Sequence, residues 1–174
     1  MRFIVDGMLG KAAIWLRLTG HDTTYYPDAD DDVLLETARD EGRILLTSDA
    51  RLHLRAETYG VVSALVRGDV DEQIAAIFVM FGIEPEIDPA RSRCSKCNGI
   101  LVEVRDKDDL RNLVHERTLA HYDRFWLCTE CRSVYFQGGQ WRNMNEYMDR
   151  LRTMIRHSER HISPGQLPEH RCGT

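Results

Sequence analysis

Residues 2–20 read RFIVDGMLGKAAIWLRLTG, in which a short apolar run is followed by apolar residues at helical spacing. The run covers residues 2–5, and Met8 opens a series that recurs every three or four residues up to Leu16. Gly20 then offers a helix stop, because glycine readily adopts the left-handed backbone that ends many helices. This stretch predicts a strand followed by a helix.

The same strand-then-helix pattern occurs three more times. The strands are expected at residues 23–26, 43–47 and 61–66, and the helices run from the acidic residue Asp30 to a stop at Gly42, then over 49–58 and 69–81. Four such units in about 82 residues predict an α/β fold, a doubly wound parallel sheet with helices on both faces.

A different organisation follows the linker that we expect between Pro85 and Pro89. Short β-like pieces lie close to two Cys-x-x-Cys pairs, residues 143–157 repeat apolar side chains at helical spacing, and the end of the chain is rich in Pro and Gly. We therefore predict a first domain at residues 1–87, a β-rich metal-binding module with a C-terminal helix at residues 88–160, and a flexible tail at residues 161–174.

Composition and charge narrow the function. Of 174 residues 43% are hydrophobic and 29% are charged, which excludes a disordered chain, and no apolar run is long enough for a membrane span. The first residues lack an export signal, so a cytoplasmic location is expected. Residues 1–87 hold 8 Lys and Arg against 16 Asp and Glu, whereas residues 88–174 hold 15 against 12. An acidic half suggests a cation site and a basic half a contact with a polyanion.

Four of the five cysteines form two pairs, Cys94 with Cys97 and Cys128 with Cys131. The Cys-x-x-Cys spacing lets two sulfurs reach one ion, and two such turns complete the tetrahedral shell that zinc prefers. Redox-active pairs or buried free cysteines are the alternatives, but two pairs of equal spacing favour metal. Because four thiolates leave no open position for water, the predicted zinc is structural. Cys172 has no partner in the sequence and is given no role.

Two aspartates directly follow predicted strands, Asp6 after the first and Asp49 after the third. Ligands of open parallel sheets bind at the carboxyl ends of the strands, so both carboxylates are expected at the ligand-binding edge. Each could instead be a helix N-cap, a position that Asp fills well. For Asp49 capping and metal binding are compatible.

The acidic cluster from Asp28 to Asp32 could simply be a favourable acidic helix start, since negative charge stabilises the N-terminus of a helix. A metal-binding role for one of these residues depends on the direction in which it points. Successive helical residues turn by about 100°, which puts Asp31 on the apolar face of the helix, whereas Asp30 and Asp32 point to either side. A helix that returns from the second strand to the third begins at the carboxyl edge, so Asp31 is expected near Asp6 and Asp49. Three converging carboxylates repel one another and need a divalent cation.

Other polar residues have both a structural and a functional interpretation. Asp69 begins a D-x-x-E capping box, which favours capping over metal binding. Lys11 lies in the first turn of a helix, where a phosphate contact and an ordinary exposed lysine are equally compatible with the sequence. His157 and His161 are spaced for chelation, but an exposed helical face is the preferred interpretation.

Four stretches in the expected order resemble the Mut-seven C-terminal ribonuclease domain family, a PIN-like nuclease fold joined to a zinc ribbon. They are FIVDGMLGKAAIWLRLTGHDT (3–23), DDDVLLETARDEGRILLTSD (30–49), CSKCNGIL (94–101) and FWLCTECRSVYFQGGQWRNM (125–144). The resemblance implies a metal-dependent ribonuclease in which Asp6, Asp31 and Asp49 bind Mg²⁺ or Mn²⁺. One departure is Gln140, which stands where the family usually has a histidine.

These observations together predict hydrolysis of RNA phosphodiester bonds at the aspartate cluster. Lys11 would hold a phosphate oxygen, and the zinc ribbon would aid binding of RNA, ribosomal or otherwise structured, through Arg132, Trp141 and Arg142. The alternative is a non-catalytic RNA- or ribosome-binding module with the same fold. A nucleotide-binding or phosphotransfer protein is disfavoured, because no glycine-rich phosphate-binding motif follows any strand.

Overall fold

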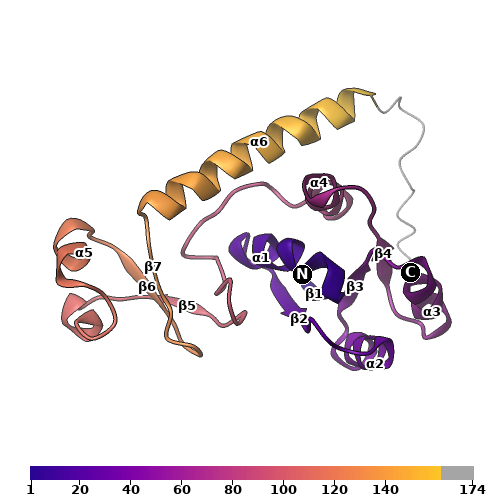
Figure 1. Cartoon of the computed structure of the whole chain (residues 1–174), viewed down its shortest axis with the longest axis horizontal. Helices are drawn as coiled ribbons and strands as arrows, with labels where there is room; N and C mark the ends of the chain where they lie inside the picture. The colour runs from indigo at the N-terminus through magenta and orange to yellow at the C-terminus, as the bar shows by residue number, and fades with distance from the viewer. Residues whose placement is uncertain (162–174) are drawn as a thin grey trace, which may run out of the picture.

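The computed structural model describes residues 1–161, with side chains to residue 157 (Figure 1). The flexible tail predicted at residues 161–174 therefore lies, apart from its first residue, outside the described part. Four parallel strands form the first sheet in the order β2-β1-β3-β4. Their bounds are Arg2–Val5 for β1, Asp22–Tyr25 for β2, Ile44–Thr47 for β3 and Ser63–Leu65 for β4. The chain goes outward from β1 to β2 and then returns across β1 to β3, so β1 and β3 are the central strands.

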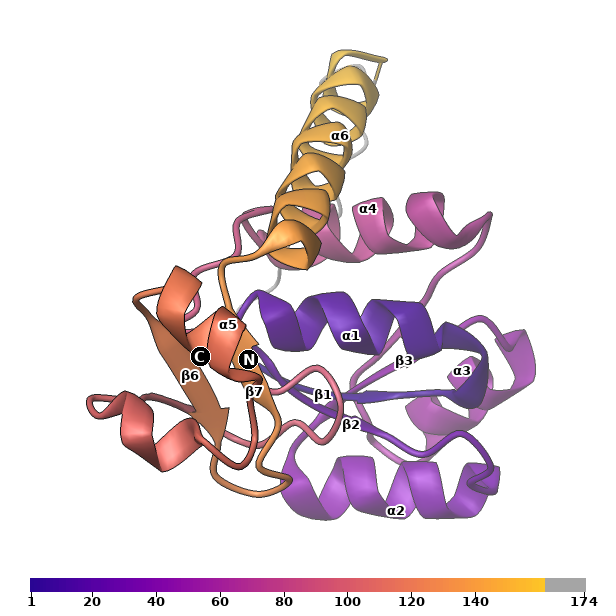
Figure 2. The same cartoon turned by 60° about the vertical axis from the view of Figure 1, so that its left-hand side comes forward.

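Helices cover both faces of this sheet, which confirms the predicted fold class (Figure 2). Because successive strand residues point to opposite faces, Phe3 and Val5 join one core with α1 (Gly10–Leu18) and α4 (Val70–Phe81). On the other face Ile4 packs with α2 (Asp31–Glu41) and α3 (Ala50–Thr58). A 3-10 turn, η1 (Gly7–Leu9), joins β1 to α1.

The second sheet is antiparallel, in the order β5-β6-β7. It consists of β5 (Leu101–Glu103), β6 (Phe125–Cys128) and β7 (Val134–Phe136). Trp126 and the first cysteine of each pair form its small core with Leu101. The insertion between the cysteine pairs holds a 3-10 turn, η2 (Lys107–Leu110), and a short helix, α5 (Glu116–His121). We call residues 93–138, which contain this sheet, the ribbon.

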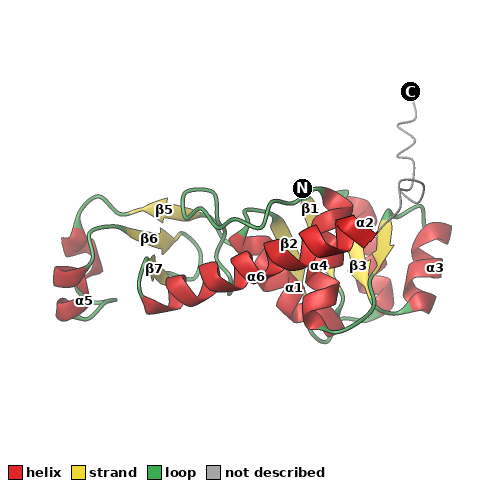
Figure 3. Cartoon of the chain, turned by 90° about the horizontal axis from the view of Figure 1, so that it is seen from above, coloured by secondary structure: helices red, strands yellow, loops and turns green. Residues whose placement is uncertain are grey.

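The last helix, α6 (Gly139–His161), starts at the ribbon and runs back across α4 (Figures 1 and 3). It is longer than the predicted residues 143–157. Its buried residues Met148 and Leu151 belong to the same core as α1 and α4. The ring of Tyr147 stacks on Trp15 at a centroid distance of 4.3 Å, and its hydroxyl donates to Asp71 at 2.8 Å. The helix therefore attaches the ribbon to the first half. No described helix has the length and apolar character needed to cross a membrane.

Candidate active site and metal centre

Thr47, the last residue of β3, connects the two aspartates that follow the central strands. Its hydroxyl donates to Asp6 Oδ2 at 2.7 Å and accepts the backbone N–H of Asp49 at 2.9 Å. Asp6 Oδ1 also accepts the N–H of Met8, and Asp49 Oδ1 accepts the N–H of Arg51, so both aspartates cap the helical turns that follow them. The structure thus brings Asp6 and Asp49 together at the carboxyl edge.

This edge is the topological switch point of the sheet. The connection after β1 leads through α1 on one face, whereas the connection after β3 leads through α3 on the other. Where two such connections diverge, parallel α/β sheets open a crevice that binds ligands. Asp6 is partly exposed and Asp49 is exposed, so both carboxylates are accessible from solvent.

Asp31 is the third predicted aspartate, and a cation of the protein itself pairs with it. The Arg55 guanidinium on α3 donates to Asp31 Oδ2 at 2.9 Å and also pairs with Asp32. Within residues 1–157, the group of three or more possible metal ligands that comes together is the four-cysteine cluster, and it includes no carboxylate. As arranged here, Asp31 therefore does not share a site with Asp6 and Asp49, and its role as a metal ligand stays a prediction.

Lys11, Asp69 and His157, which the sequence analysis also considered, are all exposed. Lys11 is exposed in the first turn of α1 and makes no ion pair within residues 1–157. Asp69 caps α4, with Glu72 closing a reciprocal capping box, so the capping interpretation is confirmed. His157 Nδ1 lies 2.7 Å from the Thr153 carbonyl oxygen. The side chain of His161 is outside the described part.

The four predicted cysteines converge. Their sulfurs all lie within 4.8 Å of one another, with Cys94–Cys131 at 3.5 Å and Cys97–Cys128 at 3.4 Å. These separations are far longer than a disulfide bond of about 2.05 Å. They are close to the value of about 3.8 Å expected for a tetrahedron with metal–sulfur bonds of about 2.3 Å. The cluster fits a metal such as zinc.

Backbone conformation shapes both cysteine turns in the same way. The residue after the second cysteine of each pair is left-handed, Asn98 with φ 69° and Arg132 with φ 60°. Each closes a turn by donating its N–H to the carbonyl of the first cysteine, at 2.9 and 3.2 Å respectively. Gly99 is required by close approach, since a Cβ there would lie 2.8 Å from Cys128 Sγ.

Hydrogen bonds and burial shift the pKa values of the cysteine thiols in opposite directions. The hydroxyl of Ser133 lies 3.3 Å from Cys131 Sγ and lowers the pKa of that thiol to about 6, which favours the metal-binding thiolate. Burial raises the pKa of Cys97 to about 12. A cation held by the cluster would favour the thiolate form of Cys97, because a metal ion deprotonates a coordinating thiol.

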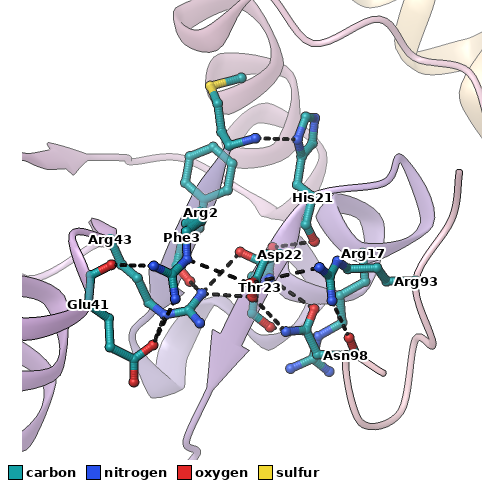
Figure 4. Close-up of polar contacts among 11 residues, drawn as sticks. Arg2, Phe3, Arg17, His21, Asp22, Thr23, Glu41, Arg43, Arg93 and Asn98 are labelled. Atoms are coloured by element: carbon teal, nitrogen blue, oxygen red, sulfur yellow. Dashed lines mark hydrogen bonds and ion pairs between the residues drawn. The ribbon is translucent and has the colours of Figure 1, made fainter. Parts of the chain in front are cut away.

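Asp22, at the start of β2, joins the two halves (Figure 4). Its Oδ1 accepts from Arg43 and from the Asn98 side chain, both at 2.8 Å, and its Oδ2 pairs with Arg2 at 3.7 Å and Arg93 at 3.9 Å. Burial by itself raises the pKa of Asp22, but hydrogen bonds from Arg43 and Asn98 outweigh it, so the pKa lies below its usual value.

The first cysteine turn covers the outer edge of β2. Asn98 Oδ1 accepts the N–H of Thr23 at 2.9 Å, and the buried Arg17 donates to the Thr23 carbonyl at 2.9 Å. Arg17 also reaches the carbonyls of Ser95 and Lys96. An edge strand with unpaired backbone groups invites aggregation, and here Asn98 of the ribbon and Arg17 of α1 satisfy the N–H and the carbonyl of Thr23.

The family model described as Mut7-C RNAse domain matches residues 1–148, which is the whole of the first sheet, the ribbon and the start of α6. The chain belongs to this family. Membership of the Mut7-C family indicates a nuclease-type function with RNA as the substrate class. No match was found among curated proteins, and none among solved structures.

Several residues that organise this Mut7-C protein were not predicted from the sequence. Thr47 is the last residue of a strand and precedes the predicted ligand Asp49 by two positions, and its hydroxyl is the sequence signal for this contact. Arg55 had no such signal, because its partner Asp31 lies 24 residues away on another helix. Asn98, directly after the first cysteine pair, occupies a left-handed position that asparagine tolerates better than most residues.

Proposed function

We propose that this Mut7-C protein is a metal-dependent ribonuclease that hydrolyses RNA phosphodiester bonds at the carboxyl edge of the first sheet. The observation that carries the proposal is the pairing of Asp6 and Asp49 through Thr47 at the topological switch point. A nuclease family and an accessible pair of carboxylates at the ligand-binding edge support the same chemistry.

The carboxylates present fit a hard divalent cation. Asp6 and Asp49 accept hydrogen bonds only from neutral N–H and O–H groups, and no Lys or Arg within residues 1–157 pairs with either. Asp49 Oδ2 has no partner among the described residues. Oxygen ligands of this kind suit Mg²⁺ or Mn²⁺. Such a cation, when bound, makes water a stronger nucleophile at neutral pH and stabilises negative charge on the phosphate.

The protein's own groups orient the site and attract the substrate. Thr47 fixes one oxygen of Asp6 by its hydroxyl, which leaves the carboxylate little freedom to rotate. Lys11, exposed at the start of α1 and without an ion pair, would contact a non-bridging phosphate oxygen. Asp31 is a proposed third ligand of the cation. It could bind the cation only after its ion pair with Arg55 is broken.

We further propose that the four-cysteine cluster binds one structural zinc ion and that the ribbon aids RNA binding. A cytoplasmic location and ribosomal or other structured RNA are part of the same proposal. The alternative is a non-catalytic RNA- or ribosome-binding module, and the pairing of Asp31 with Arg55 favours it. Incubation of purified protein with labelled RNA, with and without Mn²⁺, separates the two. The ribonuclease cleaves only with the metal, whereas the binding module retards the RNA without cutting it.

A further inference from the structure

A cleft of about 440 Å³ lies between the first cysteine turn, β7 and the start of α6. Lys96 and Arg132 supply its charged groups, and Phe136 and Trp141 supply aromatic rings. No Asp or Glu is among the described residues that line it. The protein has a net charge of -5, so a cleft lined by two cations and no carboxylate is a locally positive site on an acidic protein.

Both cations are available to a ligand. Lys96 and Arg132 are exposed, and neither makes an ion pair within residues 1–157. Other arginines of the ribbon are engaged, as Arg124 is with Glu103 at 2.7 Å and Arg93 with Asp22 at 3.9 Å. An unpaired lysine and arginine beside a hollow favour a ligand that carries negative charge, and phosphate is the anion that RNA offers.

The aromatic side chains give the cleft a second kind of contact. Phe136 and Trp141 are half-buried, so their rings are held by packing and still present surface to the cleft. Gly138 lies against the Phe136 ring, where a Cβ would come within 2.8 Å, so the chain passes the ring closely only with glycine. Unpaired bases stack on aromatic rings of this kind, whereas bases within a duplex are already stacked.

The cleft lies at the opposite edge of the sheet from the carboxylates. Leu18, the last residue of α1, lines it, whereas α1 begins with Gly10 at the edge that holds Asp6. The nine residues of α1 span about 13 Å at a rise of about 1.5 Å per residue. A nucleotide that occupied the cleft would therefore not be the one whose phosphodiester bond lay at Asp6 and Asp49.

We propose that this cleft is a second RNA subsite, which binds an unpaired nucleotide of a single strand away from the bond that is cut. The base stacks on Trp141 and Phe136, and the neighbouring phosphates contact Lys96 and Arg132. Because the cleft and the carboxylates lie at opposite ends of α1, a long unpaired strand can contact both sites and a short one cannot. The protein should therefore cleave long unpaired strands in preference to short ones. That consequence rests on the proposed ribonuclease function, whereas the binding itself does not.

A different role for the two cations leads to a different result. Both belong to the cysteine turns, and their charge would offset the four thiolates even if nothing bound in the cleft. In that case their removal weakens metal retention and leaves RNA affinity unchanged. Zinc content measured on every variant therefore accompanies each RNA measurement.

The test compares zinc-loaded full-length protein with the double variant Lys96→Ala/Arg132→Ala. The matched control is Arg105→Ala/Arg117→Ala, which removes the same charge from two exposed arginines that form no ion pair within residues 1–157 and do not line the cleft. Binding of an unpaired oligoribonucleotide is measured by fluorescence anisotropy across a salt series, with Ca²⁺ in place of Mn²⁺ and intact RNA verified after each titration.

We expect the cleft variant to bind roughly tenfold more weakly or worse, and the slope of log K against log salt to fall by about 1.4, since each phosphate contact on a single strand contributes about 0.7. Trp141→Leu, which keeps an apolar side chain but loses the stacking surface, is expected to weaken binding roughly tenfold with little change in slope. The control pair should stay within about twofold of the parent at moderate salt.

Cleavage then tests the separation of the two sites. With the cleft variant, kcat/KM for the long strand should fall roughly in proportion to affinity, and the preference of the protein for the long strand over a dinucleotide should fall by the same factor. Parent-like affinity in the cleft variant, an equal loss in the control pair, or a loss of affinity that tracks a loss of zinc would overturn the subsite. If RNA binds in the cleft but the parent cuts no RNA, the ribonuclease proposal fails and the subsite stands.

Discussion

The Thr47 hydroxyl donates to Asp6 Oδ2 at 2.7 Å, and this contact joins the ends of the two central strands. Thr47 is fully buried, and its oxygen also accepts the N–H of Asp49. One small side chain thus positions a carboxylate and the backbone of a second candidate ligand.

Replacing Thr47 by valine removes this connection while keeping the shape of the side chain. We expect Thr47→Val to lower the free energy of unfolding by about 1–3 kcal/mol, because the Asp49 N–H and an oxygen of Asp6 lose their partner. Metal-dependent cleavage should need a higher Mn²⁺ concentration. Urea denaturation and a metal titration of activity measure the two effects. Thr47→Ser keeps the hydroxyl and should resemble the parent; equal behaviour of the valine and serine variants would contradict the role of the hydroxyl.

Zinc content can be tested with two single cysteine replacements. We expect the parent to carry one zinc per chain, and Cys128→Ser to lose it because three thiolates hold the ion less tightly than four. Folding of small zinc modules depends on metal binding, so the ribbon should lose structure while the first sheet persists. Elemental analysis and proteolysis followed by mass spectrometry report both results. Cys172→Ser is the matched control and should keep its zinc; a parent without zinc after purification free of chelators would refute the assignment.

The contact between the halves can be tested by exchanging two side chains. Asn98→Asp places a carboxylate 2.8 Å from Asp22 and removes an N–H donor, so we expect a loss of about 2 kcal/mol in the free energy of unfolding. Asp22→Asn in the same chain should recover part of this loss, since one carboxylate and one amide are then restored. A double-mutant cycle by chemical denaturation measures the coupling. Strictly additive effects would show that this contact does not couple the halves.

His21 makes stability depend on pH. Burial, with a smaller effect from the amino terminus, lowers the pKa of His21 to about 4, while the unfolded chain has a pKa of about 6.5. The unfolded state then binds more protons between these values, so stability is complete above pH 6.5 and falls as the pH drops toward 4. Because the ring is only half-buried, we expect a loss of about 1–2 kcal/mol.

The matched variant His21→Gln removes the titrating ring. Its free energy of unfolding should change less than that of the parent between pH 6.5 and 4.5, measured by urea denaturation at each pH. Asp22, whose pKa is lowered, loses its contribution only at more acidic pH and does not interfere. Parallel pH profiles for the parent and the variant would show that His21 is not the titrating group.

Local structure could be predicted from the sequence, because the spacing of apolar residues along the chain reflects the helix or strand that those residues form. Short apolar runs and helical spacing indicated the four strand–helix units, and equal Cys-x-x-Cys spacing indicated the metal cluster. The helical-face argument also placed Asp31 on the inner side, since Asp31 is half-buried and Asp32 exposed.

Tertiary partners were harder to predict. The spacing of Met148 and Leu151 predicted a helix, but the same apolar face could have packed on either sheet, and it packs on α1 and α4. The pairing of Arg55 with Asp31 depends on how two helices sit side by side on one face of the sheet, which no local pattern encodes. A long, flexible arginine can reach an acidic partner from many positions, so the sequence did not reveal that Asp31 pairs with Arg55, and the role of Asp31 as a third metal ligand stays a prediction.

The central claim is that the carboxylate at Asp49 supports metal-dependent cleavage as well as capping α3. Asp49 and Asp69 are both helix N-caps that follow strands of the same sheet, and each accepts two backbone N–H groups. Asparagine caps helices about as well as aspartate, so Asp49→Asn and Asp69→Asn should both fold like the parent.

The decisive measurement is the Mn²⁺-dependent cleavage rate of labelled RNA by the parent and by these two variants. We expect Asp49→Asn to lower the rate by roughly a hundredfold or more, because the negative charge that holds the cation is lost, and Asp69→Asn to keep the parent rate. RNA affinity should be unchanged in both, since it comes from cationic groups elsewhere. Cleavage by Asp49→Asn at the parent rate, or an equal loss in both variants, would contradict the account.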